Sequence, residues 1–261
     1  MLITSSLFLR NICLANITGK LFYGGCVHFK NGSNTGNVMR LEEAKHIKYI
    51  LAKYTGNDRK LEVLLNLGSS TGDFRKIQQP HIDKYIFQPL DKTIYQVIHF
   101  DLKNDIGVDL SGNIFDVETQ KTLLKTKPTI IMCCNLMEHL DEDLRHQIPS
   151  IFDLILENEG VLLITVPYSY PVHLDPIDTY FRPSPVQLSA LFPGYYTLDK
   201  SIIESSTFLD EFLSYSLYWK IRTVVRLFTP FYKYKEWKAL IHRCLWLFKK
   251  YKISCVLLKK I

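Results

Sequence analysis

The 261-residue sequence lacks long uncharged apolar runs and the usual marks of secretion. No stretch reaches the about eighteen apolar residues that a transmembrane helix needs. The apolar stretch at residues 2–9 is short, has no basic residue before it and is followed by Arg10, which argues against a signal peptide. The six cysteines include no Cys-x-x-Cys pair and are too sparse for a disulfide framework. These absences predict a reduced, cytoplasmic protein.

Two common nucleotide-binding motifs are also missing. The turn at residues 68–73 does not have Gly-x-Gly-x-x-Gly spacing, because Ser70 and Asp73 occupy the second and third glycine positions. The same turn does not end in the Gly-Lys-Ser/Thr of a phosphate-binding loop. The sequence therefore favours neither a dinucleotide nor a nucleoside triphosphate as its ligand.

Positive charge is concentrated near the carboxyl end. Residues 220–252 hold ten lysines and arginines against one acid, Glu236, a net of +9, so the chain total of +6 leaves −3 for the rest. Apolar residues recur there at helical spacing: Trp237, Leu240, Ile241, Cys244, Leu245 and Phe248. The pattern predicts an amphipathic helix. Residues 208–251 could contact an anionic membrane surface, or the helix could pack on the core with its basic side in solvent.

Seven strand-like apolar runs alternate with helical or mixed segments. The runs cover residues 61–67, 93–101, 108–115, 129–135, 160–167, 196–204 and 253–259, with helical spacing at 41–54 and 141–157. This rhythm predicts an α/β fold, a doubly wound, mostly parallel seven-stranded Rossmann-like sheet with a helical insertion before the last strand. We expect an N-terminal arm and helix (1–58), a core (59–204 plus 253–261) and a basic insertion (205–252).

Small and polar residues follow several of these strands, at the sheet edge where doubly wound folds bind ligands. Residues 63–73 read Val-Leu-Leu-Asn-Leu-Gly-Ser-Ser-Thr-Gly-Asp, and glycine lets a ligand approach the backbone closely. Asp101 closes the second strand, where a carboxylate can accept both hydroxyls of a ribose. The residues together predict a nucleoside-type cofactor. Alone, each could be an ordinary turn or a helix cap.

In these residues the sequence resembles the class I S-adenosylmethionine-dependent methyltransferases. Their first motif has the form acid-x-Gly-x-Gly-x-Gly, and residues 66–72 read Asn-Leu-Gly-Ser-Ser-Thr-Gly. Residues 134–140 (Cys-Asn-Leu-Met-Glu-His-Leu) and 173–184 (His-x-Asp-Pro-x-Asp-x-x-Phe-Arg-Pro-Ser) match one branch of the family. The resemblance extends over about residues 60–204 and 253–260, and it implies S-adenosylmethionine as cofactor.

The resemblance also implies roles for single residues. Asp101 matches the acid that binds the ribose, and Asn113 stands where many members place an acid that binds the adenine amino group. The implied cofactor-binding residues are Asn66, Gly68, Ser69, Ser70, Gly72, Asp101, Asn113, Ile114, Asn135 and Leu136. Three of them depart from the family pattern, since Asn66 and Asn113 replace acids and Ser70 replaces a glycine.

Methylation of a hydroxyl group needs a base that takes up its proton. We expect His173 to be this base, with Asp178 second and His139 as a further candidate. Alternatively, the loop is structural and Asp178 forms an ion pair with Arg182. We predict no metal site, because Asn135 stands where metal-binding relatives have the first glutamate of a Glu-x-x-Glu-His cluster.

The expected function is S-adenosylmethionine-dependent O-methylation of a small molecule, a glycan or a lipid-linked sugar. One alternative is a non-catalytic scaffold whose cofactor turn has decayed. Another is a nucleic-acid methyltransferase, against which the sequence argues because no Asn/Asp-Pro-Pro-Tyr/Phe motif follows the fourth strand. The expected partners are the acceptor and an anionic membrane surface at 208–251. The sequence does not determine the oligomeric state.

Overall fold

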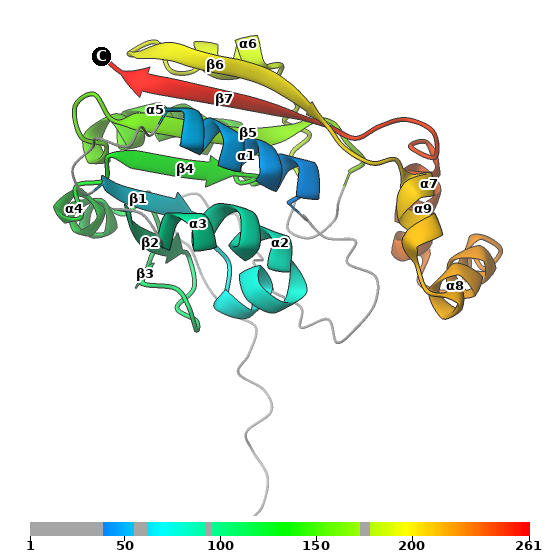
Figure 1. Cartoon of the computed structure of the whole chain (residues 1–261). Coiled ribbons are helices and arrows are strands. Elements are labelled where there is room, and N and C mark those ends of the chain that lie inside the picture. Colours follow the sequence, from blue (N-terminus) through cyan, green and yellow to red (C-terminus); the bar gives the residue numbers. More distant parts are fainter. Residues whose placement is uncertain (1–38, 55–61, 92–94, 173–177) are drawn as a thin grey trace, which may run out of the picture.

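A computed structural model describes residues 39–54, 62–91, 95–172 and 178–261 (Figure 1). Its centre is a seven-stranded sheet in the order β3-β2-β1-β4-β5-β7-β6. The strands β1 to β5 run parallel to one another, and β7 is antiparallel to both β5 and β6. The strands are β1 (Glu62–Leu67), β2 (Tyr95–Asp101), β3 (Leu110–Ser111), β4 (Ile130–Cys134), β5 (Val161–Ser169), β6 (Tyr195–Glu204) and β7 (Lys252–Lys260). The predicted fold class is confirmed.

Helices cover both faces of this sheet (Figure 1). One face carries α1 (Leu41–Tyr54) and the short helices η1 (Phe74–Gln78), α2 (Pro80–Ile82), η2 (Asp83–Phe87) and α3 (Gln88–Asp91). The other carries α4 (Val117–Lys125), α5 (Glu142–Ile155) and α6 (Pro185–Ala190). A short 3-10 turn, η3 (Met137–His139), follows β4, and the insertion holds α7 (Phe208–Ser214), α8 (Leu217–Leu227) and α9 (Tyr234–Cys244).

The two helical layers explain why the central strands read as continuous apolar runs. Along β1, Leu64 joins the apolar cluster under α1, and Leu65 joins the cluster under α4 and α5. On β5, Leu163 and Leu162 divide between the same two clusters. Because successive side chains of a strand point to opposite faces, a strand covered on both sides is apolar at every position.

The helices at 41–54 and 141–157 appear where the sequence predicts them. Asp141 is the N-cap of α5, and its side chain accepts the N–H of Leu144 (3.1 Å). Such a cap satisfies one of the free N–H groups at a helix start. The helix ends at Ile155, two residues before the predicted end, because Leu156 is extended.

The third strand is shorter than predicted. Instead of residues 108–115, only Leu110 and Ser111 pair with β2. Asn113 then turns the chain towards α4, because its Oδ1 accepts the N–H of Phe115 (3.2 Å). Side-chain to backbone bonds of this kind favour a turn over a continued strand.

The chain after the first strand forms four short helices in place of one long helix. The N–H of Gln79 bonds to the carbonyl oxygen of Phe74 (2.9 Å), five residues back, so this turn is wider than an α-turn. Pro80 has no N–H to continue the ladder and starts a new helix instead.

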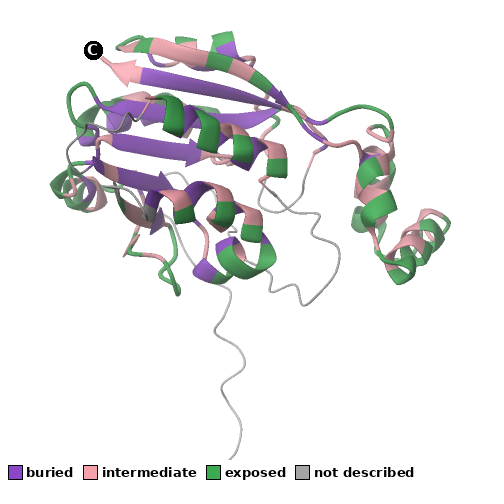
Figure 2. Ribbon diagram, viewed as in Figure 1, coloured by how far each residue is buried: buried purple, intermediate pink, exposed green. Residues whose placement is uncertain are grey.

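The insertion between β6 and β7 extends beyond the end of the sheet (Figure 1). The predicted amphipathic helix is wrong at its end, since the pattern runs through Phe248 whereas α9 stops at Cys244. The insertion also holds α7 and α8. No residue of α8 or α9 is buried (Figure 2). In the described part of the chain, no helix is long and apolar enough to cross a membrane.

Candidate functional site

The turn after β1 lies against the chain that follows β4. Gly68 has φ +68°, a conformation that glycine adopts without strain. A Cβ atom on Gly68 would lie 3.2 Å from Cδ1 of Leu136, so a larger residue would push against that side chain. The structure thus brings together two segments that are 68 residues apart in the chain and that the resemblance places in one cofactor site.

Ser70 links this turn to Asp101 at the end of β2. The N–H of Ser70 donates to Oδ2 of Asp101 (2.7 Å). Ser70 replaces the central glycine of the family motif and has φ +55°, in the left-handed region. A non-glycine residue there costs on the order of 1 kcal/mol. The turn therefore keeps a glycine-like backbone despite the substitution.

Arg75 stabilises the turn through hydrogen bonds to its backbone. Its buried guanidinium donates to the carbonyl oxygens of Ser69 (2.7 Å), Ser70 (2.6 Å) and Gly107 (2.5 Å). The loop after β2 also crosses the turn, because the N–H of Gly72 donates to the carbonyl oxygen of Ile106 (2.7 Å). Arg75 and Gly107 are not among the residues that the sequence predicts for this site. Their contacts depend on tertiary packing and leave no motif.

Asp101 has the chemistry that a ribose site requires. Its carboxylate is partly exposed and accepts two backbone N–H groups, from Ser70 (2.7 Å) and from Lys103 (3.3 Å). A carboxylate offers about four acceptor positions, so two remain for neighbouring hydroxyl groups. The residues that surround Asp101 therefore fit a nucleoside.

Asn66 lies inside the sheet, where it pairs with a histidine. Its Nδ2 donates to Nδ1 of His99 (3.1 Å), the residue beside it on β2. Burial, and secondly the nearby positive charge of Arg75, lower the pKa of His99 to about 4. A neutral imidazole can accept at Nδ1, and an asparagine amide can donate to it. Asn66, which stands where the family has an acid, thus has an uncharged histidine as its hydrogen-bond partner.

Asn113 and Ile114 lie just beyond β3, whose last residue pairs with Asp101. The Asn113 side chain accepts from Phe115 and donates to Asp116 (3.3 Å), and Ile114 is buried. The amide oxygen of Asn113 keeps a second lone pair for a ligand. The adenine-binding role of Asn113 and the contribution of Ile114 stay predictions.

At the exit of β4, Asn135 contacts Glu43, which is not among the residues that the sequence predicts for the site. The Nδ2 of Asn135 donates to Oε1 of Glu43 on α1 (2.9 Å), and the hydroxyl of Thr165 on β5 donates to the same oxygen (2.6 Å). Glu43 is fully buried, and this burial raises its pKa to about 7. A carboxyl group of that pKa gains or loses a proton near neutral pH.

The loop after β5 is bound to the exit of β4. Both the N–H and the hydroxyl of Thr179 donate to the carbonyl oxygen of Glu138 (2.9 and 2.8 Å). The neighbouring Asp178 forms a two-pronged ion pair with Arg182 (3.0 and 2.5 Å). Its side chain has no exposed surface. This pairing is the arrangement that the structural alternative for the loop predicts.

The structure describes two of the three candidate bases, Asp178 and His139. His173 lies outside the described residues. Asp178 is held by Arg182, and Nε2 of His139 lies 3.8 Å from Oε1 of the buried Glu138. Among the residues that the structure describes, no three His, Cys, Asp or Glu side chains form a group that could hold a metal ion. The catalytic roles of all three bases stay predictions.

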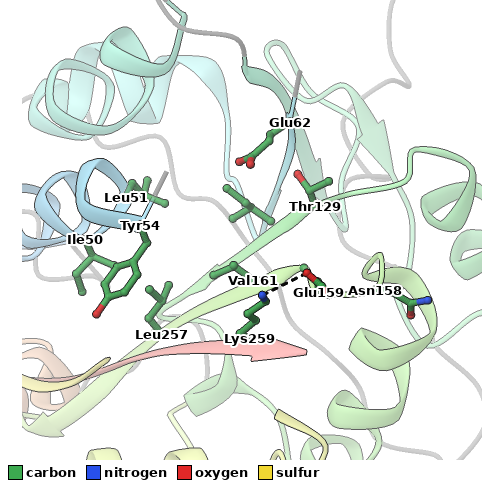
Figure 3. Close-up of a pocket in the computed structure, with 12 residues that line it drawn as sticks. Ile50, Leu51, Tyr54, Glu62, Thr129, Asn158, Glu159, Val161, Leu257 and Lys259 are labelled. Atoms are coloured by element: carbon green, nitrogen blue, oxygen red, sulfur yellow. Dashed lines mark hydrogen bonds and ion pairs between the residues drawn. The ribbon is translucent and has the colours of Figure 1, made fainter. Parts of the chain in front are cut away.

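A cavity of about 370 Å³ lies at the opposite edge of the sheet (Figure 3). Its lining includes Glu62, Ile130 and Val161, the first residues of β1, β4 and β5, together with the carboxyl-terminal turn of α1. Lys259 and Glu159 form an ion pair at its border (3.4 Å). Ligands of doubly wound sheets bind at the other edge. We therefore assign this cavity no part in the candidate site.

Comparison with known proteins gives structural matches alone. No family model matches the chain, and no curated protein does. A putative sarcosine dimethylglycine methyltransferase from Galdieria sulphuraria is similar with a TM-score of 0.52 and 15% identity, over 84% of each chain. The cyclase SpnF has a TM-score of 0.51 and 12% identity, over 84% of this chain and 81% of its own.

A methyltransferase from Archaeoglobus fulgidus, described as SAM-dependent, is also similar. Its TM-score is 0.47 and its identity 16%, over 83% of this chain and 94% of its own. The chain has a Rossmann-like methyltransferase fold. Because identity is low and one structure of this fold is named a cyclase, the likeness establishes the fold and leaves the reaction to the residues of the site.

Proposed function

We propose that this protein is an S-adenosylmethionine-dependent methyltransferase that methylates a hydroxyl group of a small molecule, a glycan or a lipid-linked sugar. The observation that carries the proposal is the contact between the glycine-like turn and Asp101. The N–H of Ser70 holds Oδ2 of Asp101 at the carboxyl edge of the sheet. Asp101 would bind the two ribose hydroxyls, and Gly68 and Leu136 would line the cofactor beside it.

The cofactor would supply an activated methyl group, so the protein mainly has to position the acceptor. The acceptor would approach the exits of β4 and β5, where Asn135, Glu43 and Thr165 are linked. His173 remains our proposed base. Asp178 fits an orienting role better, because its carboxylate is already paired with Arg182.

Isothermal calorimetry with S-adenosylmethionine tests this proposal. We expect a Kd of about 1 µM to 1 mM, the range in which enzymes hold small substrates. Asp101→Asn can still accept the N–H of Ser70 but loses the charge that strengthens bonds from hydroxyl groups. We expect it to bind about tenfold to a hundredfold more weakly, since bonds to charged groups contribute about 1.5–3 kcal/mol.

Asp153→Asn is the matched control. Asp153 is exposed, lies near the end of α5 and pairs with Lys260 at 3.6 Å. Its substitution makes the same change of charge and should leave the Kd within about twofold. If the wild-type protein does not bind the cofactor, the proposal is wrong and the scaffold alternative is favoured. Binding without methyl transfer to any hydroxyl acceptor would favour a different reaction on the same fold.

A further inference from the structure

The helix α8 presents an apolar face that no other part of the described chain covers. Leu217, Ile221, Val224 and Phe228 follow one another at steps of four, three and four residues, which places them on one side of the helix. Leu217 is 73% exposed and Phe228 is 80% exposed. In a helix that packs on a protein core, this face is the buried one.

The apolar surface continues beyond α8. Phe231, in the turn that follows, is 99% exposed, and Tyr232 beside it is also exposed. Tyr234 and Ile241 on α9, and Leu245 and Phe248 after it, are exposed as well. Scattered apolar residues are common on protein surfaces, but a set this large on neighbouring segments indicates an interaction site.

Cations alternate with these apolar residues along the segment and have few acids to neutralise them. Glu236, the single acid of residues 220–252, already pairs with Lys233 (3.0 Å) and Arg226 (3.6 Å). In the part of the chain that the structure describes, five cations of the segment have no carboxylate within 4.0 Å: Lys220, Arg222, Lys235, Lys238 and Lys249. The partner should therefore carry negative charge.

We propose that residues 208–251 bind the surface of an anionic lipid bilayer. Aliphatic and aromatic side chains would enter the boundary between headgroups and acyl chains, and the cations would contact acidic headgroups. Residues 208–251 hold nine lysines and arginines against three acids, so a second copy of this chain would bring another segment of net charge +6 against the first. RNA would use the cations and the aromatic rings but would leave the aliphatic face of α8 exposed to water.

The insertion leaves the sheet at the same edge as the cofactor turn. Ser169, the last residue of β5, pairs with Lys252, and Lys252 pairs with Glu204, the last residue of β6. A bilayer bound by the insertion would thus lie near the carboxyl edge of the parallel strands. This inference about the acceptor rests on the proposed function. If the bilayer lies near the cofactor turn, the methyl acceptor is expected to be attached to a lipid.

Vesicle flotation of the full-length chain tests the binding. The probe is a phosphatidylcholine vesicle in which about one lipid in three is phosphatidylserine, beside a vesicle of phosphatidylcholine alone. We expect the wild-type protein to float with the acidic vesicles and to float less in about 1 M salt, which reduces the Debye length to about 3 Å. Leu217→Glu/Ile221→Glu/Phe228→Glu should reduce flotation by about tenfold or more.

The matched control is Leu124→Glu/Leu154→Glu/Val186→Glu, which replaces three exposed apolar residues outside the insertion. It makes the same change of charge and should float like the wild type. Equal flotation of both triple variants would overturn the proposal. The proposal would also be overturned if the wild-type protein did not float with vesicles but bound single-stranded RNA or formed dimers. Calorimetry with S-adenosylmethionine on the same proteins reports on the proposed function independently, because none of these six residues lies at the cofactor turn.

Discussion

Glu43 joins three elements of the structure through one carboxyl group. Oε1 accepts from Asn135 and Thr165, and Oε2 accepts from the N–H of Arg40 (3.3 Å). Burial raises the pKa of Glu43 from 4.5 to about 7, while these hydrogen bonds work in the opposite direction. The folded protein therefore binds the proton of Glu43 more tightly than the unfolded chain does. The contribution of this group to stability is full below about pH 4.5 and is lost as the pH rises through about 7.

Glu43→Gln should remove this pH dependence, because glutamine resembles the protonated acid and does not ionise. We expect the wild type to lose roughly 2–3 kcal/mol of unfolding free energy relative to the variant between about pH 5 and about pH 8. Urea unfolding of both proteins at the two pH values measures this difference. Glu157→Gln, at an exposed position, should follow the wild type at both values. Parallel curves for the wild type and Glu43→Gln would contradict the raised pKa.

At the scale of elements, Gly72 and Gly107 let two loops touch. Gly107 has φ +81°, and a Cβ atom there would lie 2.7 Å from Cα of Gly72, closer than real contacts allow. Gly107→Ala should therefore lower the unfolding free energy by about 1–3 kcal/mol and weaken cofactor binding, because the loop has to move away from the turn. Denaturant unfolding and calorimetry measure the two effects.

Gly194→Ala is the control for this change. A Cβ atom on Gly194 meets no atom within 4 Å, and its φ lies outside the left-handed region. This alanine should leave stability unchanged or raise it by up to about 1 kcal/mol, since it restricts the unfolded chain. Equal losses for the two variants would show that the contact between Gly72 and Gly107 is not the cause.

Most of the sheet could be predicted because a strand that is buried on both faces appears in the sequence as a continuous apolar run. The runs that became β1, β4 and β5 are apolar at nearly every position. The extent of β3 could not be predicted, since it depends on the turn that Asn113 makes with its own backbone. The position of Asp101 at a strand end was also predictable, because parallel strands end at a common edge.

The partners within the candidate site could not be predicted in the same way. Arg75 contacts the turn from a helix that is broken into wide and narrow turns, so no regular spacing marks it. Glu43 lies in α1, before β1 in the chain. It contacts Asn135 only because α1 packs on the sheet. In the sequence, both residues look like ordinary charged residues of helices.

At the scale of the whole molecule, Glu211 on α7 connects the insertion to the core. One carboxylate oxygen pairs with Arg40, which precedes α1, and the other pairs with Arg243 on α9 (2.5 Å). All three side chains are largely buried, at 13–15% exposure. Arg40 also donates to the hydroxyl of Tyr170 (2.8 Å) and stacks over the ring of Tyr251. Glu211 therefore links Arg243 on α9 to Arg40 beside α1 through one buried carboxylate.

Glu211→Gln should loosen the insertion. Removal of one charge from a buried group of three leaves both arginines without full compensation, and we expect a loss of about 3 kcal/mol in unfolding free energy. Trypsin should cleave within residues 215–250 about tenfold faster, because local opening becomes easier. Glu236→Gln is the matched control, since Glu236 also pairs with two cations but is 57% exposed, and its loss should cost at most about 1 kcal/mol. If both variants are cleaved at the same rate, the insertion is held by its backbone and apolar contacts rather than by Glu211.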